Sequence, residues 1–267
     1  MLFVVDIGNS HIVTGVYKKN NLLETWRTSS HKNQTSDEIA ATYQTLFNLA
    51  NLEHTGIHHL IISSVVPKLE AVWLDYGRRY LSNSLKEEPF IVDSISVGSM
   101  IGIEVEQPAE VGADRLVNAI AAWHKYSGDS IVIDFGTAIT FDCISADCKY
   151  LGGMILPGIA LSMDALSAKA AKLPQIDIGK KPKSIIGKNT VDSMVLGALH
   201  GYGAMIDGIS RDLKNEMTRE GNPFTILATG GMAEIIAPCS AMIDHIEPML
   251  TLEGLKIIHE KKTAGKA

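Results

Sequence analysis

Two stretches of the chain place an aspartate, a glycine and small polar residues directly after a short apolar run. They are Asp6–Ser10, with the sequence DIGNS, and Asp134–Ala138, with the sequence DFGTA. The glycine allows the backbone to approach a ligand closely, and the neighbouring side chains offer hydrogen-bond donors. A carboxylate at the end of a buried strand is costly unless it meets a cation or several donors. We therefore expect each stretch to form a turn that faces a phosphate group.

A third glycine-bearing turn, Thr229–Gly231, follows the apolar run at residues 224–228. Three such turns in one chain, two of them in a repeated context, favour a nucleotide-binding site. The chain contains no GxxxxGK(S/T) loop, and no GxGxxG sequence follows an expected strand. The nucleotide is therefore not expected to be held in the manner of a P-loop or a Rossmann fold.

The segment 108–120 predicts a helix with a different kind of chemistry. Asp114 and Asn118 share one face of this helix, away from its apolar face. One interpretation of Asp114 and Arg115 is compensation of the helix dipole together with a surface ion pair. The other is that Asp114 accepts a proton from a substrate hydroxyl group while Arg115 binds an anionic group. The spacing alone leaves both interpretations open.

Gly187–Thr190 precedes a long helical pattern at residues 191–213. Asn189 or Thr190 is expected at the cap of this helix, either for capping alone or to direct the helix N-terminus at a ligand carboxylate or phosphate. This helical pattern includes Gly197, Gly201 and Gly203, and such glycines lower the intrinsic stability of a helix and predict a closely packed neighbour.

The elements around these residues follow a repeated order. Apolar alternation, caps and breakers predict strands and helices in the order β-β-β-α-β-α-β in the first half, and the second half begins with the same three strands. This order resembles a ribonuclease-H-like domain. The expected elements of the first half are strands at 2–7, 12–18, 22–28, 57–66 and 90–92 and helices at 36–49 and 67–81, and those of the second half include strands at 130–135, 139–145, 149–156 and 224–228.

Composition limits the classes of protein that fit. The chain has 267 residues, 46% of them hydrophobic, and a net charge of −6, so we expect sizeable cores and no nucleic-acid partner. The first apolar run is too short for a membrane span and lacks the basic flank of a signal peptide. The three cysteines are sparse and show no metal-binding spacing, which favours reduced thiols and a cytoplasmic location.

Taken together, these motifs resemble the type III pantothenate kinase family, within the superfamily of sugar kinases, actin and the chaperone ATPases. The resemblance runs in family order over about residues 2–260. The matching motifs are DIGN at Asp6–Asn9, GADR at Gly112–Arg115, DFGTAIT at Asp134–Thr140, GGMILPG at Gly152–Gly158, GKNT at Gly187–Thr190 and TGG at Thr229–Gly231.

The resemblance implies a fold, a reaction and a set of roles. The fold would be two ribonuclease-H-like (actin-like ATPase) domains at residues 1–118 and 119–267, each a mixed five-stranded sheet with flanking helices. The reaction would be ATP-dependent phosphorylation of pantothenate, with Asp114 as general base. Magnesium would bind the nucleotide and Asp6, and a monovalent cation, K⁺ or NH₄⁺, would bind Asp134. The expected ATP-binding residues are Asp6, Ile7, Gly8, Asn9, Ser10, His11, Ile12, Val13, Thr137, Gly230 and Gly231, and the expected substrate-binding residues are Val105, Gly112, Ala113, Asp114, Arg115 and Thr190. The family also implies a homodimer.

One position departs from many relatives, which carry an aromatic residue lining the pantothenate site where this chain has Val105. Two alternatives to the pantothenate kinase are a non-catalytic regulator of the same fold and a superfamily kinase acting on another hydroxyl group. The intact motifs and the acidic charge count against the regulator.

Overall fold

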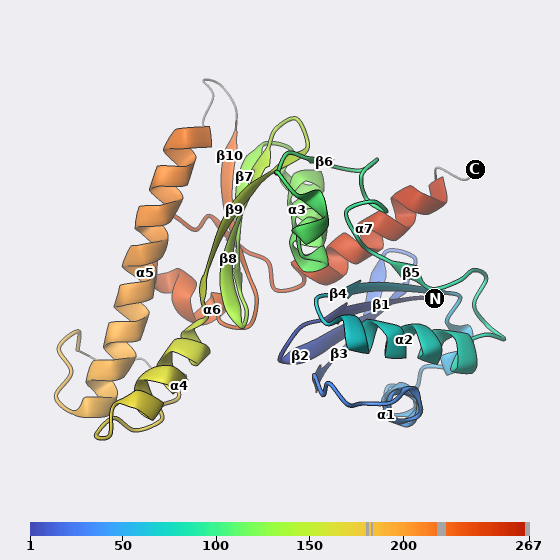
Figure 1. The fold of residues 1–267 in the computed structure, drawn as a ribbon, viewed down its shortest axis with the longest axis horizontal. Helices are drawn as coiled ribbons and strands as arrows, with labels where there is room; N and C mark the ends of the chain where they lie inside the picture. Colours follow the sequence, from blue (N-terminus) through green and yellow to red (C-terminus); the bar gives the residue numbers. More distant parts are fainter. Residues whose placement is uncertain (180–181, 183, 218–222, 265–267) are drawn as a thin grey trace. The chain divides into compact units, whose positions relative to one another are not determined.

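The computed structural model describes residues 1–179, 182, 184–217 and 223–264. The chain divides into two compact units (Figure 1). The first runs from Met1 to Ala121 and includes the C-terminal residues from Leu250 on, and the second runs from Ala122 to Met249. Each unit has its own mixed sheet and its own hydrophobic core.

The sheet of the first unit has five strands in the order β3-β2-β1-β4-β5. The first three form an antiparallel meander, whereas β4 and β5 run parallel to β1. Pairing on both sides places β1 at the centre, which explains its nearly continuous apolar sequence. The strands are β1 (Leu2–Ile7), β2 (His11–Lys18), β3 (Asn21–Ser29), β4 (His59–Ser64) and β5 (Phe90–Ile91).

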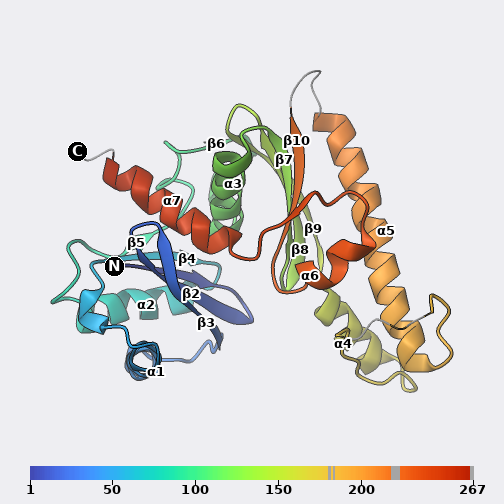
Figure 2. The ribbon, with the colours of Figure 1, turned by 180° about the vertical axis from the view of Figure 1, so that it is seen from behind.

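Helices cover both faces of this sheet, with α1 (Ser36–Leu49) and α2 (Pro67–Tyr80) on one face and α7 (Leu250–Ala264) on the other (Figure 1 and Figure 2). Thr35 caps α1 with Glu38 in a reciprocal capping box, and Pro67 opens α2.

The side chains of β1 alternate between these two layers. Phe3 packs in the core beneath α1 and α2, where its ring meets those of Tyr43 and Phe47. On the opposite face a Cβ atom at Gly15 would lie 3.2 Å from both Val4 and Leu252, so α7 packs closely on β1 and β2. The smaller elements of the first unit are 3₁₀ turns at His54–Gly56 and Pro108–Glu110 and the two-residue strand β6 (Gly102–Ile103).

The second unit repeats the strand order of the first. The sheet that contains β7 has six strands, and the five that belong to the second unit lie in the order β11-β10-β7-β8-β9. Strands β7, β8 and β9 form an antiparallel meander, and β10 and β11 run in the parallel direction to β7. Thus β7 corresponds to β1 and β10 to β4, which confirms the expected pair of ribonuclease-H-like sheets. The strands are β7 (Asp129–Phe135), β8 (Ala138–Ser145), β9 (Lys149–Pro157), β10 (Phe224–Thr229) and β11 (His245–Ile246).

The helices of the second unit are α4 (Ile159–Lys169), α5 (Thr190–Met217) and the short α6 (Ala233–Ile236), which a 3₁₀ turn at Ala237–Cys239 follows. The glycines of α5 have two different environments. Gly203 is buried against Cys239, whose carbonyl carbon would lie 2.8 Å from an added Cβ atom, as the sequence predicted. Gly197 and Gly201 have no neighbour within 4 Å of that position and line a cavity instead, so the prediction was wrong for them.

The helix α3 (Ala113–Tyr126) contains the boundary between the two units, and its first nine residues belong to the first unit. There it packs closely on α7, because an added Cβ atom at Gly254 would lie 2.5 Å from the carbonyl oxygen of Val117. Thr251 also donates a hydrogen bond of 2.8 Å to the buried side chain of Asn118. Within the described part of the chain, no helix has both the length and the apolar character needed to cross a membrane.

Candidate active site

The turn between β1 and β2 presents its polar residues to solvent. Gly8 closes the turn by donating its N–H to the carbonyl oxygen of His11 at 3.0 Å, and a Cβ atom at Gly8 would lie 3.1 Å from that oxygen. Asn9, Ser10 and His11 are exposed, whereas Asp6 is half-buried at the end of the strand. The turn therefore offers the amide, hydroxyl and backbone donors that a phosphate group requires. The remaining members of the expected set, Ile7, Ile12 and Val13, lie in the flanking strands.

The N-terminus of α3 carries the Gly112–Arg115 segment. The carbonyl oxygen of Gly112 accepts hydrogen bonds from the N–H groups of Arg115 and Leu116 at 3.1 and 3.3 Å, so the helix begins directly after this glycine. Asp114 lies in the first turn, and its Oδ1 accepts the N–H of Arg115 at 2.8 Å. A Cβ atom at Gly112 would lie only 2.5 Å from the same Oδ1, which explains the small residue at this position.

Burial raises the pKa of Asp114 above its ordinary value. The hydrogen bond from the Arg115 N–H and the positive charge of Arg115 act in the opposite direction, but the loss of solvation is the larger effect. A raised pKa makes this carboxylate a stronger base than an exposed aspartate. The finding favours a functional role for Asp114 over the alternative of a simple surface ion pair.

The structure brings the first glycine turn and the start of α3 to the same edge of the first unit. The N–H of Val65, just after β4, donates to the carbonyl oxygen of Ile7 at 3.1 Å. The side chain of Val65 in turn lies 3.5 Å from the position of a Cβ atom at Gly112. The carboxyl ends of the parallel strands β1 and β4 therefore adjoin the helix that carries Asp114. Val105 is half-exposed in the segment between β6 and the Pro108–Glu110 turn, and its contact with a substrate stays a prediction.

The turn between β7 and β8 has the same construction as the turn between β1 and β2. Gly136 donates its N–H to the carbonyl oxygen of Ala138 at 3.0 Å, and Asp134 is half-buried at the end of the strand. Thr137 is exposed, and its carbonyl oxygen accepts the N–H of Gly158 at 3.0 Å. An added Cβ atom at Gly158 would overlap the carbonyl oxygen of Thr137 and lie 2.6 Å from that of Gly136. The GGMILPG motif that contains Gly158 does not by itself predict this packing role.

The third glycine turn lies directly against Asp134. Thr229 at the end of β10 pairs with Asp134 across the parallel ladder, and Gly230 follows with a φ of 87°. A Cβ atom at Gly230 would overlap Asp134 Oδ1 and lie 2.7 Å from the backbone nitrogen of Phe135. The exposed Gly231 follows it. The structure thus brings Asp134, Thr137, Gly230 and Gly231 together in the second unit.

Asp6 and Asp134 are the residues of the expected site that suit a cation. Each ends a central strand beside a glycine turn, and carboxylate oxygens are ligands for hard cations such as magnesium. Around Asp134, Gly136 and Gly230 also keep the space near the carboxylate clear of side-chain carbon. The carboxylate chemistry of both residues therefore fits a hard cation.

Thr190 is the first residue of α5, but it does not cap the helix. Asn189 does so, since its Oδ1 accepts the N–H of Asp192 at 2.8 Å and its carbonyl oxygen accepts the N–H of Ser193 at 3.0 Å. Thr190 is exposed and lines a cavity of about 620 Å³ with an otherwise mostly apolar wall. That wall includes Leu156, Met163, Leu166, Met194, Tyr202 and Met205.

The duplicated sheet, with a glycine turn after each central strand, is the fold that actin-like ATPases and sugar kinases share. Solved structures with the same fold include a Campylobacter jejuni protein assigned to the Baf family of transcriptional activators, with a TM-score of 0.58, 19% identity and coverage of 98% of this chain and 99% of that one. Another is a Porphyromonas gingivalis protein assigned as an N-acetylglucosamine kinase, with a TM-score of 0.51, 12% identity and coverage of 98% and 100%. At these identities the likeness concerns the fold alone.

Sequence comparison identifies the family. The model of the type III pantothenate kinase family matches residues 2–212. A type III pantothenate kinase from Desulfotalea psychrophila is 45% identical over 258 residues, which cover 97% of both chains. One from Geobacter sp. strain M21 is 46% identical over 261 residues, which cover 98% of this chain and 99% of the relative. The chain belongs to the type III pantothenate kinase family.

Proposed function

We propose that this chain is a pantothenate kinase, which transfers a phosphoryl group from ATP to the primary hydroxyl group of pantothenate and gives 4'-phosphopantothenate. This is the first step of coenzyme A biosynthesis. Relatives that match nearly the whole chain are named type III pantothenate kinase. The structural observation that carries the proposal is Asp114, a carboxylate of raised pKa at the N-terminus of α3, beside the first glycine turn.

Asp114 acts as the general base in this proposal. The N–H of Arg115 fixes the orientation of the Asp114 carboxylate, which accepts the proton of the pantothenate hydroxyl group. The hydroxyl oxygen forms a bond to the γ-phosphorus while the bond from that phosphorus to the bridging oxygen breaks, and ADP leaves. Such a base contributes about 10²–10⁴-fold to the rate. The first turn of α3 adds backbone N–H groups and the guanidinium of Arg115, which suit the pantothenate carboxylate.

The three glycine turns bind ATP in this proposal. Asp6–Val13 supplies donors from the first unit, and Thr137, Gly230 and Gly231 supply the second nucleotide-binding surface. Asp6 would hold magnesium, and Asp134 would hold K⁺ or NH₄⁺, and these cations supply positive charge to the phosphate oxygens. The described turns have no lysine or arginine between Asp6 and Val13 or between Asp134 and Thr140, so cations are the natural source of that charge.

Pantothenate would contact Val105, Gly112, Ala113, Arg115 and Thr190. The exposed hydroxyl group of Thr190 is available to a ligand because Asn189 performs the capping of α5. Val105 is smaller than the aromatic residue that many relatives have. We therefore expect it to contact a smaller area of the substrate and to leave the chemistry of phosphoryl transfer unchanged.

The chain would act as a cytoplasmic homodimer. Large apolar side chains are exposed on β9, on α4 and around the start of α5, and such exposure is typical of a surface that another chain covers. Ile155 of β9 is 65% exposed and Leu161 of α4 is 52% exposed. The others in this part of the second unit are Leu151, Met154, Leu166, Ile185, Ile186 and Val191.

The proposal is tested by the release of ADP from magnesium-ATP, with and without pantothenate, in potassium and in sodium buffer. We expect ADP release that depends on pantothenate and is faster in potassium. Release that depends on a different hydroxyl acceptor would overturn the choice of substrate. Binding of ATP with no stimulation by any acceptor would favour the regulator instead, an alternative for which the family match gives no support.

A further inference from the structure

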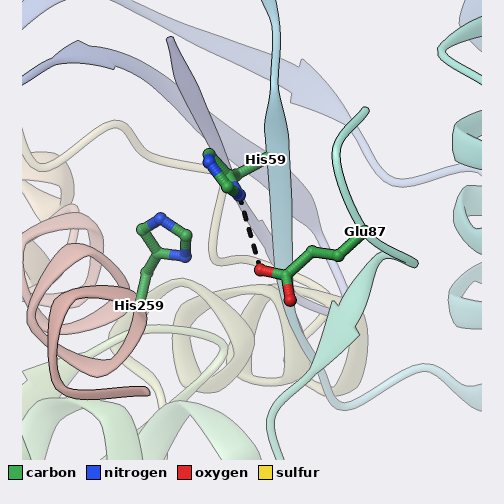
Figure 3. Close-up of side chains that lie close together, drawn as sticks. All are labelled: His59, Glu87 and His259. Atoms are coloured by element: carbon green, nitrogen blue, oxygen red, sulfur yellow. Dashed lines mark ion pairs between the residues drawn. The ribbon is translucent and has the colours of Figure 1, made fainter. Parts of the chain in front are cut away.

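Three side chains from distant parts of the sequence meet in the first unit, far along the sheet from the glycine turn. They are His59 at the start of β4, Glu87 in the loop before β5 and His259 on α7 (Figure 3). One ligand atom from each residue lies within 4.8 Å of the other two. Figure 3 shows the three side chains pointing toward one another. None of them takes part in the kinase reaction proposed above.

We propose that His59, Glu87 and His259 form a binding site for a divalent transition metal ion, with zinc as the best fit, that fastens α7 to the sheet of the first unit. Two imidazoles and one carboxylate make a donor set that suits zinc, whereas magnesium and calcium prefer oxygen ligands alone. Water would complete the coordination.

The distances are close to those that a metal ion needs. A tetrahedral zinc ion with bonds of about 2.1 Å holds its ligand atoms about 3.4 Å apart. Nδ1 of His59 already lies 3.4 Å from Oε1 of Glu87. The imidazole rings of His59 and His259 have their centroids 4.5 Å apart, with an angle of 50° between their planes. A small rotation of the His259 side chain would therefore complete the site.

The backbone holds two of the ligands in place before any metal binds. His59 pairs with Leu2 in the parallel ladder between β1 and β4. The loop that carries Glu87 is fixed to the same strand, because Lys86 donates its N–H to the carbonyl oxygen of His58 at 3.0 Å. His259 lies on helix α7, directly after the buried residue Ile258. Leu255 of the same helix is also buried, so the helix is well packed. Little conformational entropy is then lost on binding.

One buried nitrogen makes only a long contact. Nδ1 of His59 is buried, and apart from its 3.4 Å ion-pair contact with Oε1 of Glu87 it has no hydrogen-bond partner within the described residues. Buried polar atoms in native proteins are seldom left without a partner, and an ion is one way to satisfy them.

The surrounding charges are mixed. Nζ of Lys262 lies 3.5 Å from Oε2 of Glu87, the oxygen that faces away from His59, and 4.0 Å from the ring centroid of Phe90. Lys86 and the N-terminal ammonium group add positive charge near His59, and Glu260 adds negative charge near His259. Glu87 can therefore bind a metal through Oε1 while Oε2 keeps its ion pair with Lys262, an outer partner of the kind that metal-bound carboxylates commonly have.

The position of this cluster separates it from the proposed kinase site. His59 pairs with Leu2 at one end of the β1–β4 ladder, whereas Ile7 pairs with Ser64 at the other end, beside the glycine turn. Five residues of strand span about 17 Å. The ion would therefore stabilise the fold without touching the reacting groups. It would fasten the same helix that packs on α3 through Gly254 and Thr251.

The test uses the full-length chain, freed of metal with a chelator and titrated with Co²⁺, which reports tetrahedral coordination by its visible absorption. We expect one equivalent to bind with tetrahedral bands, and Zn²⁺ to displace it and raise the Tm by about 3 °C or more at saturating concentration. His259→Ala and Glu87→Gln should each weaken Co²⁺ binding at least tenfold. His124→Ala, which removes an exposed histidine of α3, is the matched control and should bind like the wild type.

The Glu87→Gln variant guards against a folding artefact, because the substitution keeps the size of a loop side chain. Absence of tetrahedral bands in the wild-type protein would overturn the proposal, and so would equal binding by the wild type and both ligand variants. Since the readouts are metal binding and thermal stability without nucleotide, the result does not depend on the kinase activity.

Discussion

Gly230 lies directly against Asp134, so closely that a single added carbon at Gly230 would overlap the carboxylate oxygen Oδ1. The φ of Gly230 is 87°, a backbone conformation that other residues rarely adopt. The parallel pairing of Thr229 with Asp134 sets this proximity. The backbone at the end of β10 and the Asp134 carboxylate at the end of β7 thus constrain each other's position. The proposed nucleotide and cation sites depend on both.

A methyl group at Gly230 should therefore harm both stability and nucleotide binding. We expect Gly230→Ala to lower the free energy of unfolding by about 2–4 kcal/mol, from backbone strain and the overlap with Asp134, and to raise the KM for ATP. Urea unfolding and steady-state kinetics measure the two effects. Gly208→Ala in α5 is the control, because it has no neighbour within 4 Å of its Cβ position and should stabilise the chain by about 0.5–1 kcal/mol. Equal stability of the two variants would contradict the packing described here.

Asp114→Asn should separate catalysis from binding. If Asp114 is the base, we expect kcat to fall about 10²–10⁴-fold while the affinities for ATP and pantothenate change little. Asp212→Asn, which changes an exposed aspartate of α5, should keep normal turnover. Near-wild-type turnover of Asp114→Asn would remove Asp114 from the role of base.

The raised pKa of Asp114 predicts two pH effects of defined sign. The wild-type kcat/KM should rise with pH along an acidic limb whose pKa lies above the ordinary aspartate value of about 3.9, because the base must be ionised. For stability, a carboxyl group with a raised pKa in the folded state favours folding at low pH, and this contribution is lost as the pH rises through that pKa. At pH 8, Asp114→Asn should therefore be at least as stable as the wild type in urea. A clear loss of stability at pH 8 would contradict the desolvation described for Asp114.

Asp134→Ala tests the proposed monovalent cation. We expect the concentration of potassium needed for half-maximal activity to rise at least tenfold, or activity to disappear, because the substitution removes the carboxylate ligand. Titrations with KCl, NH₄Cl and NaCl at constant ionic strength provide the measurement. An unchanged potassium dependence would assign the cation elsewhere.

The capping box of α1 predicts a pure stability effect. Glu38 donates its N–H to Thr35 Oγ1 at 3.3 Å, and Thr35 donates its N–H to Glu38 Oε2 at 2.7 Å. Thr35→Ala should lower the free energy of unfolding by about 1 kcal/mol without affecting kinetic constants. Thr45→Ala, in the exposed middle of the same helix, is the matched control and should be neutral or slightly stabilising. A similar loss in both variants would point to the helix surface and not to the cap.

Sequence patterns predicted most of the strands and helices because local chemistry determines them. The meander strands follow from period-two alternation, and α1 and α2 begin at Ser36 and Pro67, the first residues of the helices expected at 36–49 and 67–81. Helix α4 was not predicted, and its apolar residues are largely exposed in this unit, so its pattern lacks a clear buried face.

Contacts between distant segments were beyond the reach of local patterns. Nothing near Leu250 indicates that α7 packs on β1 and β2, and the cluster of His59, Glu87 and His259 exists only through that packing. The close packing of Gly158 against Thr137 also depends on a distant contact, because the end of β9 lies beside the turn between β7 and β8. For Thr190 the pattern left two residues open as the cap, and only the hydrogen bonds of Asn189 decide between them.

The packing of α7 on the first sheet has a consequence for how the chain folds as it is made. One face of the central strand, with Val4 and its neighbour Gly15, needs Leu252 as cover, yet the ribosome delivers Leu252 only after the whole second unit. At roughly 5–20 residues per second, the nascent N-terminal sheet waits on the order of ten seconds for its last helix. During that interval an apolar sheet face is open to water, to chaperones or to another nascent chain. The first unit to emerge is therefore the last to be completed.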